Sequence, residues 1–198
     1  KTLGELLAYA RANPGKLNVG TINVGSTQNL AAELFKTSAG VDVQVVPFNG
    51  TPAVITALRG GQIDAAVEIL SPVVPQINAR ALRALAVMGE KRSATLPDVP
   101  TVAESGLKGF NVASWNAVAA PAKTPAAVVQ RLNREIQAAL KTPEVQKQLL
   151  AMHIEARGGS PEQLGQLLAS ETQRRGDVLT RANIPRQQLD PRSPANIV

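Results

Sequence analysis

The chain has 198 residues, of which 44% are hydrophobic and 18% are charged, a composition typical of a globular protein with one domain or slightly more. It contains no cysteine and one histidine, which excludes disulfides, iron–sulfur clusters, thiolate zinc sites, cysteine nucleophiles and histidine-rich metal sites. The net charge of +6 favours an anionic partner, but only 3% of the residues are aromatic and the basic residues are dispersed, so we expect no nucleic-acid partner.

A repeated helix-start pattern is the most regular feature of the chain. A Ser or Thr followed by a proline favours the start of a helix. The hydroxyl accepts a hydrogen bond from a free backbone amide of the first turn. The proline has no amide hydrogen, but at this position the amide would have no partner within the helix. Such pairs precede the predicted helices at Thr51-Pro52, Ser71-Pro72, Thr124-Pro125, Thr142-Pro143 and Ser160-Pro161. Thr2 with Glu5 predicts a capping box, and Ser26 or Thr27 precedes a further amphipathic helix.

Short apolar runs alternate with these helices and predict strands. The runs lie at residues 17–20, 43–47, 65–68 and 82–87. Strands that alternate with helices are typical of a mostly parallel sheet with helices on its faces. We therefore expect an α/β unit over about the first 88 residues.

The second half of the chain has a different organisation. Residues 89–109 are interrupted by Pro, Gly and basic residues and predict a linker-like stretch. Residues 110–120 predict an extended segment, which at about 3.4 Å per residue spans about 37 Å, enough to cross between two lobes. Helices are predicted at about 125–141, 143–151 and 161–182, followed by an irregular tail.

The loop at residues 20–27 is the first candidate site, because ligands of open α/β sheets bind at the carboxyl ends of the strands. It is rich in glycine and hydroxyls and opens onto a helix, whose free amides and dipole favour an anion. Ser26 stands where a phosphate-binding loop needs lysine, so a small carboxylate fits better than a nucleotide. The alternative is an ordinary strand–helix turn.

Two later loops at the same edge add candidates. Gly50 permits close approach of a ligand to the backbone. Phe48 is expected either to line a ligand pocket or to pack in the core beneath a capped turn. Glu68 follows a buried strand, where a carboxylate is costly unless it is paired. It either receives an amine or hydroxyl of a ligand or pairs with an arginine such as Arg80.

Nothing in the sequence supports catalysis. His153 lies near a predicted helix end without an acid or nucleophile patterned around it, which favours a surface or helix-capping role. A nucleophile elbow and a dinucleotide fingerprint are both missing. No run of about 18 apolar residues occurs. We expect no enzyme, no metal, no cofactor and no membrane-spanning helix.

Several segments, in the same order, resemble one known family. They are LLAYARANPGKLN (6–18), AELFKTSAG (32–40), VPFNG (46–50), GGQID (60–64), LRALAV (82–87), LPDVPTVAESG (96–106), Trp115 and APAKTP (120–125). Over about residues 3–182 the chain resembles the Bug-type receptors, the periplasmic substrate-binding proteins of tripartite tricarboxylate transporters.

The resemblance implies a type II periplasmic-binding-protein fold that captures a small organic carboxylate between two lobes for uptake by the membrane components of the transporter. It implies ligand contacts from Thr21, Asn23, Gly25, Ser26, Thr27, Asn29, Phe48, Gly50 and Glu68. The family usually has His, Lys and Asp where this chain has Asn29, Asn49 and Glu68, which bears on ligand preference.

The resemblance also implies a division of the chain. Residues 1–115 are expected to form the second, ligand-binding lobe, residues 116–182 the crossover strand and the helices that complete the incomplete first lobe, and residues 183–198 an irregular tail. Amphipathic helices without their sheet leave an apolar patch, so residues 125–182 are expected to dock onto another copy, as a homodimer, or onto their own lobe. The alternative function is the effector-binding domain of a transcription regulator, which shares this architecture.

Overall fold

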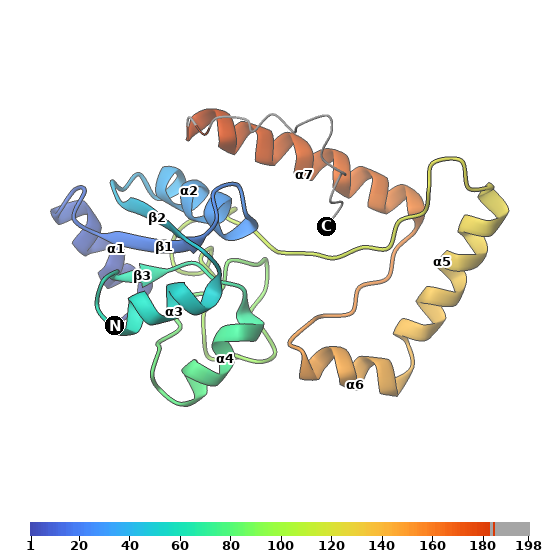
Figure 1. Cartoon of the computed structure of the whole chain (residues 1–198), viewed down its shortest axis with the longest axis horizontal. Coiled ribbons are helices and arrows are strands. Elements are labelled where there is room, and N and C mark those ends of the chain that lie inside the picture. Colours follow the sequence, from blue (N-terminus) through green and yellow to red (C-terminus); the bar gives the residue numbers. More distant parts are fainter. Residues whose placement is uncertain (183, 185–198) are drawn as a thin grey trace.

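The computed structural model describes residues 1–182 and residue 184. In chain order its elements are α1 (Leu3–Ala12), β1 (Asn18–Ile22), α2 (Thr27–Ala39), β2 (Gln44–Phe48), α3 (Thr51–Arg59), β3 (Ala65–Ala66), α4 (Leu70–Asn78), α5 (Ala126–Leu140), α6 (Pro143–Ala151) and α7 (Pro161–Arg181). Figure 1 shows the strands and the first four helices gathered in one part of the molecule. An extended segment leads from this part to α5 and α6, and α7 returns to lie along α2.

The three strands form one parallel sheet in the order β2-β1-β3. Val19 of the central strand pairs with Val45 on one side and with Ala65 on the other. Asp64, just before β3, accepts a hydrogen bond from the amide of Asn18 at 2.8 Å and so caps the start of the central strand. The α/β class predicted from the alternating pattern is confirmed.

The fourth predicted strand, at residues 82–87, is wrong. Within the described part of the chain, its only ladder contact is an isolated parallel bridge between Val87 and Thr101. The backbone of Val87 is used elsewhere, because its amide donates to the Pro100 carbonyl and its carbonyl accepts from the Val102 amide. Leu85 and Ala86 pack against the hydrophobic core instead.

The main hydrophobic core joins the sheet and its first two helices to residues that follow the sheet. Leu7 of α1, Phe35 of α2 and Val43 are buried together with Val102 and Phe110. The rings of Phe35 and Phe110 meet edge to face with centroids 6.2 Å apart, a favourable aromatic geometry. The core therefore holds the chain against the sheet as far as Phe110.

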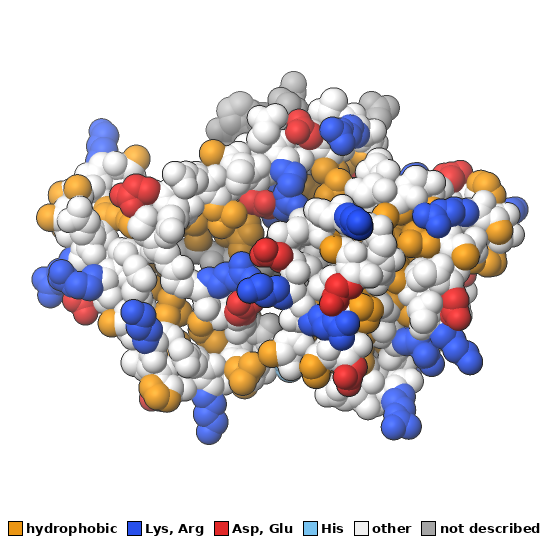
Figure 2. All heavy atoms as spheres, turned by 180° about the vertical axis from the view of Figure 1, so that it is seen from behind, with side chains coloured by type: hydrophobic (Ala, Val, Ile, Leu, Met, Phe, Trp, Pro, Cys, Tyr) orange, Lys and Arg blue, Asp and Glu red, His pale blue; other side chains and the backbone are white. Residues whose placement is uncertain are grey.

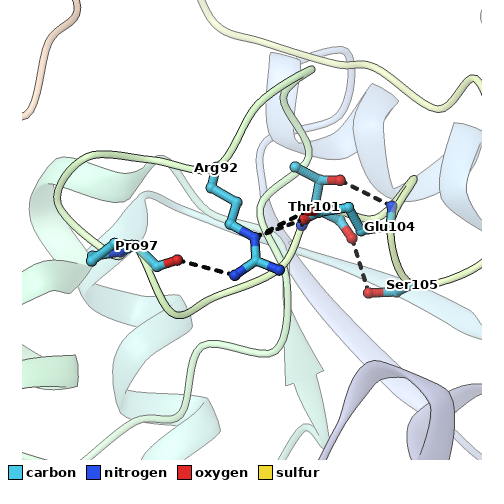
Figure 3. A network of polar contacts seen from close by, with 5 residues as sticks. All are labelled: Arg92, Pro97, Thr101, Glu104 and Ser105. Carbon is cyan, nitrogen blue, oxygen red and sulfur yellow. Dashed lines mark hydrogen bonds and ion pairs between the residues drawn. The ribbon is translucent and has the colours of Figure 1, made fainter.

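The stretch at residues 89–109, predicted to be linker-like, is tied to itself by a polar network (Figure 3). The Arg92 Nε donates to both carboxylate oxygens of Glu104, at 3.1 and 3.0 Å, and its Nη1 donates to the Pro97 carbonyl. Glu104 also accepts from the Thr101 amide at 2.7 Å. The Thr101 amide, followed by Arg92, holds the pKa of Glu104 below its usual value. This stretch is an ordered loop of the sheet part.

Several helix-start predictions are confirmed. Ser160 accepts from the Gln163 amide at 3.2 Å, and the Gln163 side chain accepts in return from the Ser160 amide at 2.8 Å. Thr2 and Glu5 form the predicted capping box of α1, and Ser26 caps α2. These hydroxyls satisfy amides that have no helical partner.

The other hydroxyl–proline pairs do not cap as predicted. Thr51 and Ser71 lie inside α3 and α4, and α5 begins only after Pro125. Thr142 stands at the N-cap position of α6 but its side chain accepts no capping bond. At α3 the N-cap is Gly50, which leaves the Thr51 hydroxyl available for a different partner.

The C-terminal helices have little core of their own in the described residues. No residue of α5 or α6 is buried, and α7 has one, Val178. His153 follows the end of α6 with a φ of +59°, and its Nδ1 lies 3.0 Å from the Thr95 hydroxyl of the sheet part. The extended segment at residues 113–120 makes no backbone hydrogen bond to the described residues.

Side chains at the surface are mixed in character. Figure 2, seen from behind, shows apolar side chains exposed in several places and Lys and Arg side chains spread over the face. Among residues 1–182 and 184, no helix has the length and hydropathy of a membrane span. The same residues contain no cluster of three or more His, Asp or Glu side chains suited to hold a metal.

Candidate functional site

The carboxyl ends of the three parallel strands lie at one edge of the sheet and lead into α2, α3 and α4. This arrangement brings together side chains that are far apart in the sequence. The Glu68 Oε2 accepts a hydrogen bond from the Thr51 hydroxyl at 2.9 Å and a longer one from the Gln28 side-chain amide at 3.5 Å. A carboxyl group thus bridges the first turns of α2 and α3.

Glu68 has an unusual environment for an acid. Burial raises its pKa above the usual value, while hydrogen bonds from Thr51, Gln28 and the Ile69 amide act in the opposite direction. Its Oε1 is buried and has no hydrogen-bond partner among the described residues. The ion pair with Arg80, one of the two predicted alternatives, is not formed. The protein donors Thr51 and Gln28 meet only the other oxygen of this carboxyl, Oε2.

The amides at the start of α2 are partly used by the protein itself. The Ser26 Oγ accepts from the Asn29 amide at 3.1 Å, the Ser26 amide donates to the Asn23 carbonyl, and the Gly25 amide donates to the Asn29 side chain. The amides of Thr27 and Gln28 have no partner among the described residues. The group of free amides expected from the sequence is therefore smaller than predicted, and these two amides remain.

Two of the predicted site residues lie beneath this turn. Asn29 and Thr21 are 3% and 0% exposed, and the Asn29 Nδ2 donates to the Thr21 hydroxyl at 3.2 Å. The Asn29 Oδ1 is occupied by the Gly25 amide. The polar atoms of Asn29 and Thr21 therefore fix the shape of the turn, while Asn23 and Gly25 are exposed on it.

Phe48 and Gly50 occupy the neighbouring loop after β2. Phe48 is partly buried and packs against the cluster of Val54, Ala57 and Ile63, which agrees with the core alternative for this ring. Gly50 has φ +89° and ψ +161°, a backbone conformation essentially confined to glycine. The sharp entry into α3 places Thr51 next to Glu68.

The structure adds a residue that the sequence did not indicate. The Arg175 Nη1 on α7 lies 3.3 Å from the Thr27 hydroxyl, across a separation of 148 residues. Arg174 and Arg175 both pair with Glu171, at 2.6 and 3.4 Å. Burial acts to raise the pKa of Glu171, but the two guanidinium groups hold it below its usual value. The sequence carries no local signal for this contact, since Lys91-Arg92 is an adjacent basic pair as well.

Comparison with known proteins agrees with the resemblance found in the sequence. Residues 1–184 match the family described as the tripartite tricarboxylate transporter family receptor. A curated relative, a UPF0065 protein of Pseudomonas sp. strain P51, is 39% identical over 141 residues, which cover 71% of this chain and 42% of the relative. The chain thus spans about two fifths of the length of that relative.

Solved structures show the same fold. The structure of R. palustris Rpa4515 with adipate is 34% identical, with a TM-score of 0.79, and the match covers 92% of this chain and 61% of that chain. MatC of Rhodopseudomonas palustris with bound malate is 32% identical, with a TM-score of 0.71 and coverage of 90% and 62%. The chain has a fold of the periplasmic-binding-protein type and belongs to the receptor family of the tripartite tricarboxylate transporters.

Proposed function

We propose that this chain is the ligand-binding part of an extracytoplasmic receptor, periplasmic in location, which captures a small organic carboxylate for a tripartite tricarboxylate-type transporter. The observation that carries the proposal is the first turn of α2, where the amides of Thr27 and Gln28 have no partner among the described residues, beside the Glu68 carboxyl. Family membership supports it, as do related receptors solved with adipate and malate.

The chemistry of this turn suits a carboxylate. The amides of Thr27 and Gln28 lie at the positive end of the helix dipole and can donate hydrogen bonds to an anion, although neither amide is itself charged. The Ser26 and Thr27 hydroxyls lie beside them. In this proposal Asn23, Gly25, Ser26 and Thr27 line the ligand, together with Gly50. Thr21, Asn29 and Phe48 support the loops from below.

In this proposal Glu68 binds a second polar group of the ligand. Its unpartnered Oε1 accepts a hydrogen bond from a hydroxyl or ammonium group of the ligand once the covering side chains move aside, since this atom is buried in the free protein. A buried acceptor left without a donor is costly, so it favours a ligand that carries one. The receptor's partners are this ligand and the membrane components of the transporter.

Titration of the ¹⁵N-labelled chain with malate and with adipate tests the proposal. We expect shifts of the Thr27 and Gln28 amide resonances and a Kd of about 1 mM, which corresponds to about 4 kcal/mol, since this chain spans only part of the receptor length. If neither acid shifts these resonances, the proposed function is wrong.

A pair of variants separates the amide from the hydroxyl. Thr27→Pro removes both groups at a helix position where proline is tolerated, whereas Thr27→Val removes only the hydroxyl. We expect Thr27→Pro to weaken malate binding about tenfold and Thr27→Val to weaken it less. Equal affinities for the two variants would contradict an amide-based site.

A further inference from the structure

Helix α7 packs closely against α2, the helix whose first turn forms the proposed site (Figure 1). Val178 of α7 is buried in this contact, and the seam contains a cavity of only about 20 Å³, room for about one water molecule. Apolar side chains line the seam, among them Leu30, Ala31 and Leu34. The position of α7 relative to the first turn of α2 is therefore fixed by side-chain packing.

Arg175 lies one helical turn before Val178 and is directed to the site by this packing. Its Nη1 lies 3.3 Å from the Thr27 hydroxyl, and its Nε lies 3.4 Å from a Glu171 oxygen. Glu171 makes its shorter contact, 2.6 Å, with Arg174, whose guanidinium also donates to the Asn111 carbonyl. Two guanidinium groups and one carboxylate leave one net positive charge beside Thr27.

The two sides of the first turn of α2 therefore differ in charge. Thr27 faces Arg175 on α7, whereas the next residue, Gln28, faces the acidic group of Glu68. A ligand carboxylate that accepts from the Thr27 amide lies within a few ångströms of the guanidinium and is attracted to it, while Glu68 repels it from the other side.

We propose that Arg175 is a specificity-determining residue of the receptor, whose guanidinium provides the counter-charge for one ligand carboxylate bound at Thr27. This inference rests on the proposed function and assigns a role in it to the C-terminal helix. The neutral amides hold the carboxylate in position, and Arg175 makes the site select an ionised organic acid. Because Arg175 is about one-third exposed, its contribution is sensitive to salt.

Binding of malate and adipate to three variants of the whole chain tests the inference, by the same resonance titration at low and high salt. Arg175→Gln keeps a hydrogen-bonding side chain but removes the charge, and we expect it to weaken both ligands about tenfold and to flatten the salt dependence. Arg175→Lys keeps the charge, and we expect it to recover most of the affinity. Arg181→Gln is the matched control, because Arg181 is an exposed basic residue in the last turn of the same helix, and we expect less than about a twofold change for it.

The packing of α7 is checked in each variant from the amide resonances of Leu30 and Ala31, which lie in the seam. If Arg175→Gln binds as tightly as the unaltered chain, with the same salt dependence, the inference is wrong while the proposed function stands. A loss that Lys does not rescue and that salt does not modulate shows a purely structural role, which also overturns the inference. If the unaltered chain binds neither acid, the proposed function itself fails.

Discussion

Adjacent residues at the start of α2 have opposite electrostatic neighbours. Thr27 contacts the Arg175 guanidinium at 3.3 Å, and Gln28 contacts the Glu68 carboxyl at 3.5 Å. Successive residues of a helix point about 100° apart, so one turn presents two different surfaces to a ligand. A ligand with a carboxylate at one end and a donor group beside it is therefore bound in one orientation.

The raised pKa of Glu68 predicts a pH effect on stability. The folded protein binds the proton of this group more tightly than the unfolded chain does, so its contribution is most favourable at low pH and is lost as pH rises through the folded pKa. We therefore expect the unfolding free energy of Glu68→Gln, relative to that of the unaltered chain, to rise between pH 4 and pH 7. Urea denaturation at both pH values measures this gain.

A second acid provides a control of opposite sign. The pKa of Glu104 is lowered by the Thr101 amide and Arg92, so its contribution is present above the pKa of the unfolded chain and is lost as pH falls. We expect Glu104→Gln to lose stability relative to the unaltered chain as pH rises. If Glu68→Gln behaved in the same way, the interpretation of Glu68 would be contradicted.

Gly50 carries a backbone conformation that a side chain cannot readily adopt. At φ +89° and ψ +161°, we expect Gly50→Ala to cost about 1–3 kcal/mol of unfolding free energy. Gly165→Ala is the matched control, because that glycine lies inside α7 with open space around it, and we expect a gain of about 0.4–1 kcal/mol. Urea denaturation compares the two, and a neutral Gly50→Ala would count against this account of the α3 entry.

At the level of elements, the sequence predicted the order of strands and helices because their signals are local. Hydrophobic periodicity and capping residues act within a few positions of the chain, and three strands and all the major helices follow them. The run at residues 82–87 carries the same local signal, but the Val87 backbone bonds with Pro100 and Val102 instead of with the sheet. Sheet membership depends on distant residues and was not predictable from the run itself.

In the candidate site, too, the local features were predictable and the contacts between distant residues were not. Its position at the carboxyl ends of the strands follows from the parallel sheet, so the loops around Ser26, Gly50 and Glu68 were predictable. The hydrogen-bond partners were not: the Thr51 hydroxyl was predicted to cap its own helix and instead donates to Glu68. Arg175 gave no signal because its contact with Thr27 depends on how α7 packs.

The helix-start pairs give a test at this scale. Ser160 caps α7, whereas Thr124 precedes α5 without a capping bond, although both stand before a proline. We expect Ser160→Ala to lower the unfolding free energy by about 1 kcal/mol and Thr124→Ala to change it by less than about 0.5 kcal/mol. Helical circular dichroism during denaturation measures both. Equal losses in the two variants would mean that the hydroxyl–proline pattern, rather than the observed bond, determines stability.

Over the whole molecule, burial is concentrated at one end. The buried hydrophobic residues of the described chain lie almost all before residue 111, and Val178 is the exception. The exposed large hydrophobic residues of the C-terminal part are Val118, Val128, Leu132, Leu150, Met152, Ile154, Leu167 and Leu168. In the described residues, α7 packs against α2, and His153 after α6 lies 3.0 Å from the Thr95 hydroxyl, so both contacts are made with the sheet part of the same chain. The structures solved for this family are longer than the match, which covers 61% of the first of them.

The exposed apolar surface of α5 and α6 predicts self-association of this chain through residues 125–182. We expect a homodimer whose population rises with protein concentration, because contact between copies removes side chains such as Leu132 and Leu150, 48% and 59% exposed, from water. The double variant Leu132→Glu/Leu150→Glu is expected to weaken association by about tenfold or more, since burial of each leucine contributes about 1.5–3 kcal/mol. Tyr9→Glu is the matched control, because Tyr9 is 50% exposed on α1 of the sheet part. Sedimentation equilibrium measures the dimer population of each variant. A monomer at every concentration, or a control that weakens association equally, would show that residues 125–182 are not the contact surface.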